Sequence, residues 1–168
     1  ATREQCAQVV VKNKRNALYN PAASYGSSLE LEDVLNSEPI AYPLSQQDIS
    51  AHADGSIVVI LAAANVAESL PNDPIWIRGI GWCNDASSLE TRAWGRAIYA
   101  EEAGKQAYRM AGIRNPMEEI DFAEIDDTYS YKELQHLEAL GFCLFGEAGH
   151  LTADGVTDVG GYLPVNIS

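Results

Sequence analysis

Polar side chains that can do acid–base chemistry are most concentrated in the stretch Glu124-Ile-Asp-Asp-Thr-Tyr-Ser-Tyr131. Residues 119–125 are predicted to form a strand, and a helix follows that ends at Gly141. In open α/β sheets ligands bind beyond the carboxyl ends of the strands, where a helix N-terminus supplies N–H donors. The stretch is therefore a candidate site for binding or catalysis.

A structural role is the alternative for the same stretch. Asp127, Thr128 or Ser130 could cap the helix that follows, and Glu133 could interact favourably with the helix dipole. His136 lies at helical spacing within that helix, which favours a packing or surface role over a ligand role. No two histidines share a helical face and no H-E-x-x-H motif occurs, so no metal site is predicted.

Other motifs of catalysis are absent from the sequence. Gly79-x-Gly81 lacks the third glycine of a dinucleotide fingerprint, and neither a phosphate-binding loop nor G-x-S-x-G occurs. The three cysteines, Cys6, Cys83 and Cys143, are far apart and each has apolar neighbours. We interpret them as reduced and buried, which indicates a cytoplasmic location.

Composition narrows the class of protein. The chain has 168 residues, of which 46% are hydrophobic and 21% are charged, as expected for a globular domain with a core. A net charge of −13 disfavours nucleic-acid binding, and the acidic residues are dispersed rather than blocked. No apolar run is long enough to cross a membrane.

The elements that must position the polar stretch follow an α/β order. Thr2-Arg-Glu-Gln5 fits a capping box for a first helix that reaches about Leu18. Gly79 and Gly81 indicate either bulges or close backbone approach, and a helix rich in alanine can pack closely against a neighbour. The chain begins without Met and ends in mid-pattern, so we expect it to be part of something longer. Strands are expected at Ile57–Leu61, Ile75–Trp82 and Glu119–Ile125, and further helices at Leu31–Leu35, Ala62–Leu70 and Arg92–Ile113.

Several blocks, in order, resemble the C-terminal half of a thiolase, most closely the branch of sterol-carrier-protein-x and the archaeal acetyl-CoA acetyltransferases. Upstream, three short blocks resemble that branch's loop domain and a fourth its return into the N-terminal half. The downstream blocks are 124–134, Leu137-Glu-Ala-Leu-Gly-Phe-Cys, Gly146-Glu-Ala-Gly, Asp154-Gly-Val-Thr and Gly160-Gly-Tyr-Leu-Pro-Val-Asn-Ile-Ser, and the upstream ones are Thr2-Arg-Glu-Gln, Val11-Lys-Asn-Lys-Arg-Asn-Ala, Asn20-Pro-Ala-Ala and Asp54-Gly-Ser.

This resemblance implies the thiolase fold, a layered αβαβα arrangement of the α/β class, present as a partial chain. Residues 1–55 would be the remainder of the loop domain, 56–70 the last strand and helix of the N-terminal half, and 71–168 a C-terminal domain that stops before its final catalytic motifs. The nucleophilic cysteine of the family would lie outside this chain. We therefore expect the segment alone to be inactive.

The resemblance also assigns site residues. Asp126 takes the position of an Asn or His that orients a water or a thioester oxygen, and Asp127 takes the acidic position beside it. Burial and a neighbouring carboxylate would raise the pKa of Asp126, which would make it an oxyanion donor or a general base. Ser50 and His52 would lie beside the pantetheine arm of coenzyme A, in a loop that could instead merely turn at Asp54-Gly55.

The expected function is that of a thiolase-like acyltransferase, which makes or breaks a carbon–carbon bond in a 3-oxoacyl-CoA of lipid metabolism. Two alternatives remain open: a thiolase-fold retro-aldolase acting on a 3-hydroxyacyl-CoA, and a non-catalytic acyl-CoA-binding subunit. Coenzyme A and acyl-CoA would be substrates, with no tightly bound cofactor. A homo-oligomer, dimer or tetramer, is expected, with a second subunit as a further partner and neither nucleic acid nor membrane.

Overall fold

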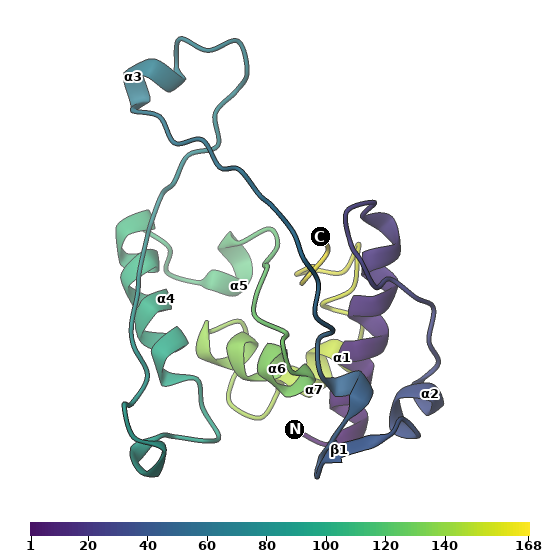
Figure 1. Cartoon of the computed structure of the whole chain (residues 1–168). Coiled ribbons are helices and arrows are strands. Elements are labelled where there is room, and N and C mark those ends of the chain that lie inside the picture. The colour runs from purple at the N-terminus through teal and green to yellow at the C-terminus, as the bar shows by residue number, and fades with distance from the viewer.

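The first helix, α1, lies at the centre of the packed part of the structure. The computed structural model describes all residues, 1–168. Helix α1 spans Arg3–Asn16, and the predicted capping box is confirmed: Thr2 Oγ1 accepts from the N–H of Gln5, while Gln5 Oε1 accepts from the N–H of Thr2. Helices α2 (Leu31–Leu35), α6 (Ser130–Ala139) and α7 (Ala148–Ala153) all pack against α1, as Figure 1 shows.

The hydrophobic core has two parts, one on each side of α1. Val9 faces the larger part, which unites α6, α7 and the end of the chain, and Ala7 and Val10 face α2 through Val34. The larger part consists of Val9, Ala123, Leu134, Leu137, Phe142, Ala148, Leu163 and Val165. Because these residues come from both ends of the sequence, α1 and the last 45 or so residues must fold together.

Short β-structure joins the first third of the chain to α6. Strands β1 (Pro39–Ala41) and β2 (Leu44–Ser45) form an antiparallel pair, followed by a 3₁₀ turn at Gln46–Asp48. Ile49 then forms an antiparallel bridge with Tyr129, and the N–H of Ser50 donates to the carbonyl of Thr128 at 2.9 Å. This contact brings the loop near Ser50 to the residues just before α6.

The strands predicted at 57–61 and 75–82 are not formed, which corrects that prediction. Both segments are extended, and the side chains from Ile57 to Leu61 are 74–90% exposed. They form the two long arms that reach the short helix α3, Ala64–Ala67, which is also shorter than predicted (Figure 1). A strand is stable only when its N–H and C=O groups pair with a neighbour, and the described residues supply none.

Helix α4 packs against the second arm through small residues, as the sequence predicted. Gly79 and Gly81 lie so close to the α4 carbonyls of Ala107 and Ala103 that a Cβ would clash. Helix α4 spans Ile98–Ala111 rather than starting at Arg92, since Gly95 interrupts the first turn of the predicted helix.

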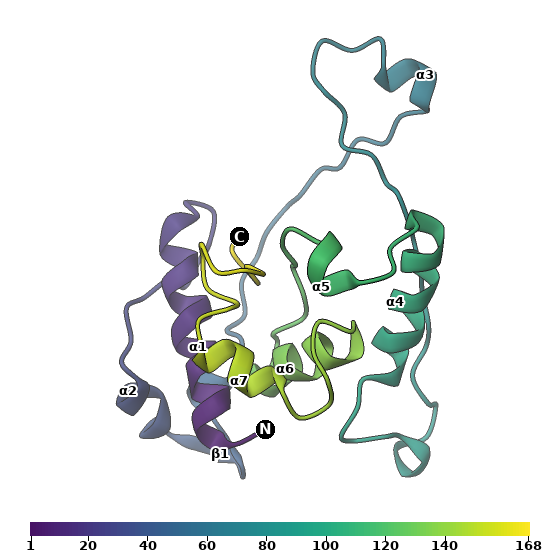
Figure 2. The ribbon, with the colours of Figure 1, turned by 180° about the vertical axis from the view of Figure 1, so that it is seen from behind.

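The polypeptide after α4 delivers α6 to the core. The predicted strand at 119–125 is reduced to a parallel bridge between Ala123 and Val165, again because no further strand lies beside it. Gly112 and Gly141 adopt left-handed φ angles and end α4 and α6. Helices α5 (Pro116–Glu119) and α7 were not predicted from the sequence. Figure 2 shows α7 and the chain end against α1.

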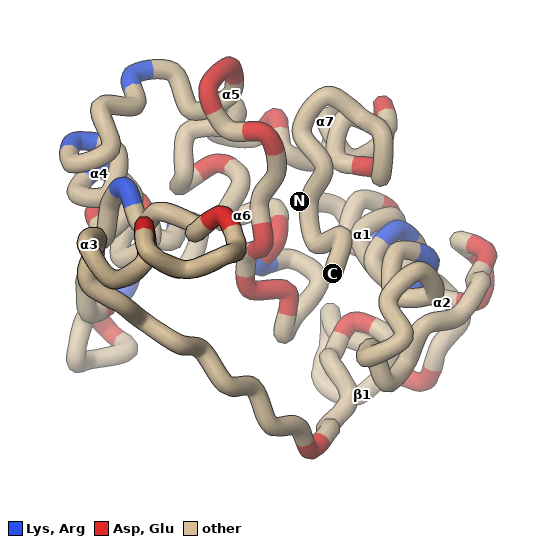
Figure 3. The backbone as a smooth tube through the Cα atoms, turned by 90° about the horizontal axis from the view of Figure 1, so that it is seen from above, with Lys and Arg blue, Asp and Glu red and all other residues tan.

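Acidic residues occur in several separate parts of the chain rather than in one block, as the sequence indicated, and Figure 3 shows them scattered along the backbone with acid-free stretches between them. None of the helices is both long enough and apolar enough to cross a lipid bilayer.

Candidate functional site

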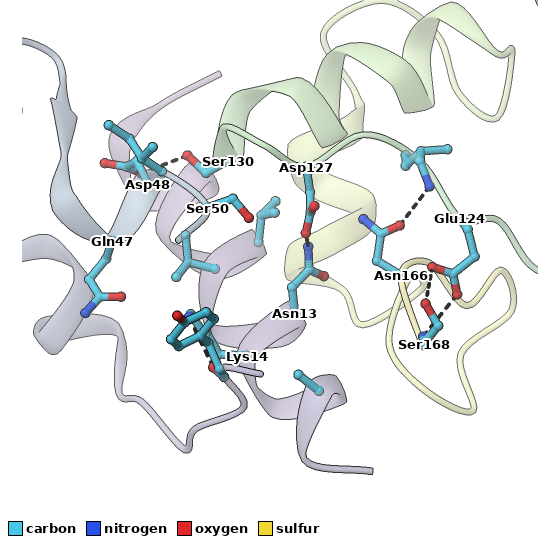
Figure 4. Close-up of a pocket in the computed structure, with 16 residues that line it drawn as sticks. Asn13, Lys14, Gln47, Asp48, Ser50, Glu124, Asp127, Ser130, Asn166 and Ser168 are labelled. Carbon is cyan, nitrogen blue, oxygen red and sulfur yellow. Dashed lines mark hydrogen bonds between the residues drawn. The ribbon is translucent and has the colours of Figure 1, made fainter. Parts of the chain in front are cut away.

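A cavity of about 480 Å³ lies between α1, the loop that follows β2, and the segment that leads into α6. Segments far apart in the sequence meet here, because α1 and the chain end share one core. Figure 4 shows the lining residues, most of which are polar. They are Val9, Val10, Asn13, Lys14, Ala17, Tyr25, Gln47, Asp48, Ile49, Ser50, Glu124, Ile125, Asp127, Ser130, Asn166 and Ser168.

Two of the predicted site residues, Ser50 and Asp127, line this cavity together. Ser50 is held there by the bond from its N–H to Thr128. His52 is exposed and is not among the lining residues, although its carbonyl accepts a hydrogen bond from the Tyr25 hydroxyl at 2.8 Å. The structure thus brings Ser50 and Asp127 to one site and leaves the imidazole of His52 outside it.

Asp127 is oriented by an amide from α1. Asn13 Nδ2 donates to Asp127 Oδ2 at 2.8 Å, as Figure 4 shows. The same Nδ2 donates to Glu133 Oε2 at 2.7 Å, so one side-chain amide joins two carboxylates. Asn166 Nδ2 also donates to Glu133 Oε2, at 2.9 Å, while Asn166 Oδ1 accepts from the N–H of Ile125. The wall of the cavity is therefore a connected hydrogen-bond network.

Glu133 and Lys12 form a fully buried ion pair behind that wall. Lys12 Nζ lies 2.8 Å from Glu133 Oε1, with 2% and 0% of the two side chains exposed, and it also donates to the carbonyl of Val165 at 3.0 Å. Burial raises the pKa of Glu133, and the Lys12 ammonium and the Asn13 amide oppose that shift. Both charges are removed from water, which is unfavourable. The ion pair is therefore stable only because each charge is compensated by the other and by its hydrogen-bond partners.

A second buried carboxylate, Asp48, fixes the opposite wall. Its Oδ1 accepts from the Ser130 hydroxyl at 2.8 Å, and its Oδ2 accepts from Arg3 and from the N–H and hydroxyl of Ser45. Burial raises the pKa of Asp48, but these hydrogen bonds and the Arg3 guanidinium outweigh it and lower the pKa overall. Asp48 thereby ties the 3₁₀ turn to both α1 and α6.

Asp126 turns away from the cavity. Its Oδ1 accepts from the N–H and the hydroxyl of Thr128, at 2.9 and 2.6 Å, and its Oδ2 accepts from Lys132 at 3.0 Å. Burial raises the pKa of Asp126, yet the Thr128 and Lys132 contacts outweigh it and lower that pKa to about 2. The expectation of a raised pKa is therefore wrong, because the carboxylate is 39% exposed and has a cationic partner.

The alternative prediction, that Asp127, Thr128 or Ser130 caps helix α6, is also wrong. The N-cap residue of α6 is Tyr129, which makes no side-chain cap bond, and Ser130 donates to Asp48 instead. It is Asp126 that satisfies the backbone, through a turn that closes on Thr128 before the helix begins.

His136 is a buried packing residue, as the sequence favoured. Its Nε2 lies 2.8 Å from the Tyr99 hydroxyl and its Nδ1 lies 3.3 Å from the carbonyl of Asp126. Only a protonated Nδ1 can donate to that carbonyl, so we assign Nε2 as the acceptor for Tyr99. Burial lowers the pKa of His136.

The cysteines are all free, and none lines the cavity. Cys6 and Cys143 are partly buried, and burial raises the pKa of Cys143 to about 12. Cys83 is exposed, which corrects the prediction that it is buried; it lies on the extended arm rather than in a packed strand. No three His, Cys, Asp or Glu side chains are grouped to hold a metal ion.

Four residues of this network were not predicted from the sequence as a set: Lys12, Asn13, Glu133 and Asn166. Their signal was weak: Lys12 and Asn13 interrupt the apolar run Val9–Val11 of a helix, and Glu133 precedes the buried Leu134. Asn166 adopts φ 53°, a left-handed conformation that Asn tolerates better than most residues.

Comparisons with known proteins agree with this fold. Residues 83–168 match the family described as "Thiolase C-terminal domain-like". The chain is 34% identical to an acetyl-CoA acetyltransferase of Methanothermobacter thermautotrophicus, covering 99% of this chain and 43% of that protein. It is 33% identical to a steroid side-chain-cleaving aldolase of Thermomonospora curvata, covering 99% of this chain and 44% of that protein.

A solved structure, the "Ltp2-ChsH2(DUF35) aldolase", superposes with a TM-score of 0.84 at 30% identity, over 99% of this chain and 45% of that chain. The chain thus spans less than half the length of the curated relatives it matches. The thiolase fold expected from the sequence, present here as a partial chain, is confirmed by the family match and by this superposition.

Proposed function

Because this chain belongs to the thiolase family, we propose that its protein makes or breaks a carbon–carbon bond in an acyl-CoA thioester. The observation that carries the proposal is the cavity in which Ser50 and Asp127, two residues assigned from the resemblance, face one space. Similar proteins named as enzymes, an acetyltransferase and an aldolase, support catalysis over a purely binding role.

The parts of the chain are proposed to divide as the sequence indicated. Residues 1–55 supply the loop-domain wall of the cavity, 56–70 the last strand and helix of the N-terminal half, and 71–168 the C-terminal domain. The two exposed arms support this division, because their apolar residues are of the kind that a sheet in the rest of the protein would bury.

Coenzyme A is proposed to bind as substrate through the Ser50 wall. Ser50 lines the cavity and its hydroxyl makes no hydrogen bond within the protein, so that hydroxyl is available to an amide or carbonyl of the pantetheine arm, while the bond from the backbone N–H to Thr128 holds the residue in place. The exposed position of His52 supports contact only with the outer end of coenzyme A.

Asp127 is proposed as the proton-transfer group. Its carboxylate faces the cavity, and Asn13 occupies one of its oxygens. The other oxygen is then directed to substrate, where an ionised carboxylate removes a proton and a protonated one returns it. Asp126 is proposed to act beside it by holding the turn that aims Asp127, through Thr128 and Lys132.

Two reactions fit these groups. In the first, a cysteine thiolate attacks the 3-oxo carbon of a 3-oxoacyl-CoA, the C2–C3 bond breaks, and the CoA-bearing fragment leaves as an enolate that takes up a proton; the acyl group then passes from the cysteine to the thiol of coenzyme A. Since no cysteine of this chain lines the cavity, that nucleophile would come from another segment of the protein. In the second, a base removes the hydroxyl proton of a 3-hydroxyacyl-CoA, the C2–C3 bond breaks to leave an aldehyde or ketone at C3, and the CoA-bearing fragment leaves as an enolate that takes up a proton, with no cysteine. The relatives favour neither reaction over the other, because the chain is 34% identical to an acetyltransferase and 33% identical to an aldolase.

Assembly and location are proposed in the same way. The solved structure similar to this chain is named for two components, which supports a second subunit beside a homo-oligomer. Three free cysteines support a reducing compartment, the cytoplasm.

One experiment separates the two reactions. The full-length protein is incubated with a 3-oxoacyl-CoA plus coenzyme A, and separately with a 3-hydroxyacyl-CoA, and the products are identified by mass spectrometry. Shortened acyl-CoA from the first mixture supports acyl transfer, while an aldehyde or ketone from the second supports the aldolase. The absence of cleavage in both mixtures would exclude both reactions and leave the acyl-CoA-binding subunit.

A further inference from the structure

Asn13 makes a contact that only a small number of side chains can make. Its single Nδ2 group donates to Asp127 Oδ2 and to Glu133 Oε2, so its two N–H groups are divided between two carboxylates. Both partners are acceptors, which fixes the orientation of the amide without ambiguity. Asn13 Oδ1 is buried and has no hydrogen-bond partner, so nothing else holds the amide in this rotation.

The Glu133 end of this bridge is rigid. Glu133 is 0% exposed, is paired with Lys12, and accepts a further hydrogen bond from Asn166. The Asp127 end lies at the cavity, where its carboxylate has no other hydrogen bond within the protein. Asn13 therefore transmits the fixed position of a buried ion pair to a carboxylate that is otherwise free to rotate.

Other residue types fail at position 13 for identifiable reasons. An aspartate would place a third carboxylate between Asp127 and Glu133, and a leucine of similar shape would supply no donor. A side chain with one hydroxyl can donate to only one of the two carboxylates. The amide of Asn13 is neutral and has two N–H donors, so it suits a position between two carboxylates in both its charge and its number of donors.

We propose that Asn13 is a positioning residue that acts through Asp127, holding its carboxylate in the orientation that the carbon–carbon bond chemistry requires. This inference rests on the proposed function, since it needs Asp127 to transfer a proton. The inference predicts an effect on turnover rather than on binding. A carboxylate misplaced by about 1 Å costs on the order of 10²-fold in rate, whereas substrate affinity depends on residues in the other walls of the cavity.

The test is a double-mutant cycle on the full-length protein, with kcat and KM measured on whichever thioester is cleaved. Asn13→Leu, Asp127→Asn and the double variant are compared with the wild type, and Arg15→Gln serves as the control. Arg15 lies on the same helix but on its exposed face, where it pairs with Asp158 at the surface. The melting temperature of every variant is recorded beside its kinetics.

We expect Asn13→Leu to lower kcat by about 10- to 100-fold with KM changed less than about 3-fold, as for an interaction needed in the transition state. In the Asp127→Asn background the same change should lower kcat by less than about 2-fold, because the group it positions is already lost. Arg15→Gln should match the wild type.

Equal losses in both backgrounds would overturn the inference and indicate a purely structural role. An Asp127→Asn enzyme with normal kcat would overturn it as well, since Asn13 would then have nothing to position. If Asn13→Leu does not fold, Asn13→Ser keeps one donor and is compared in the same cycle. A wild-type protein without turnover refutes the proposed function itself, and the inference then falls with it.

Discussion

Replacing Lys12 by methionine tests whether the buried ion pair supports the cavity. Methionine matches the length of the lysine side chain and removes its charge, so packing is nearly kept. The Glu133 carboxylate, 0% exposed and 2.8 Å from Lys12 Nζ, then loses the cation that compensates it. Removing one member of a buried pair costs about 3–5 kcal/mol, a large share of the total stability of a typical protein.

The same change predicts a pH dependence with a definite sign. Burial already raises the pKa of Glu133 above its ordinary value of 4.5, and loss of Lys12 raises that pKa further. At Glu133 the folded variant therefore binds more protons than the unfolded chain, so the contribution of this group to stability is greatest below pH 4.5 and falls as pH rises toward its folded pKa. The loss of stability relative to the wild type should therefore grow as pH rises from 4.5.

Urea unfolding of the full-length protein, followed by tryptophan fluorescence from pH 4 to pH 8, measures both effects. Three further variants sharpen the result. Lys12→Met combined with Glu133→Leu should recover much of the lost stability, because both charges are gone. Glu133→Gln should remain destabilised, because its NH₂ group must face Lys12 or the two asparagine donors. Arg15→Gln, which breaks an exposed pair, should change little. A Lys12→Met protein as stable as the wild type at pH 8 would refute this account of the pair.

Three further predictions concern the cavity, the turn and the arms. Ser50→Ala in the full-length protein should weaken acyl-CoA binding by about 0.5–1.5 kcal/mol in calorimetric titration, while Ser56→Ala should not; equal affinities would remove Ser50 from the site. Asp126→Ala should lower stability at pH 7 but not near pH 2, since the lowered pKa of about 2 contributes stability only above that range; thermal melts at both pH values check this, and an equal loss at both would contradict it. The isolated 168-residue segment should aggregate in sedimentation velocity, because 57–61 and 75–82 expose apolar residues and unpaired backbone; a monomer with a cooperative two-state melt would contradict it.

Local signals in the sequence predicted the elements whose causes are local. The capping box at Thr2, the left-handed Gly141 and the close approach at Gly81 each follow from one residue type and its immediate neighbours. The strands at 57–61 and 75–82 were expected from equally clear patterns but are absent, because strand formation depends on partners elsewhere. An apolar pattern therefore indicates that a segment tends to form a strand, but it does not indicate whether a neighbouring strand is present to pair with it.

The site was predictable only in part for a similar reason. Family resemblance led to Ser50 and Asp127, which share the cavity, and to Asp126 and His52, which do not line it. Adjacent residues on an extended segment point to opposite sides, so Asp126 faces Lys132 while Asp127 faces Asn13. The partners of Glu133 come from α1 and from the chain end, more than 30 residues away in either direction, and no local pattern could reveal them.

The most direct test of the central claim is the turnover of acyl-CoA by the full-length protein before and after Asp127→Asn. We predict that the wild type cleaves a carbon–carbon bond of a 3-oxoacyl-CoA or a 3-hydroxyacyl-CoA, and that Asp127→Asn lowers kcat by at least about 10²-fold, in the range of general acid–base catalysis, with the melting temperature little changed. A wild type that cleaves neither thioester, or an Asp127→Asn enzyme that retains the wild-type kcat, would contradict the claim that this cavity performs the chemistry.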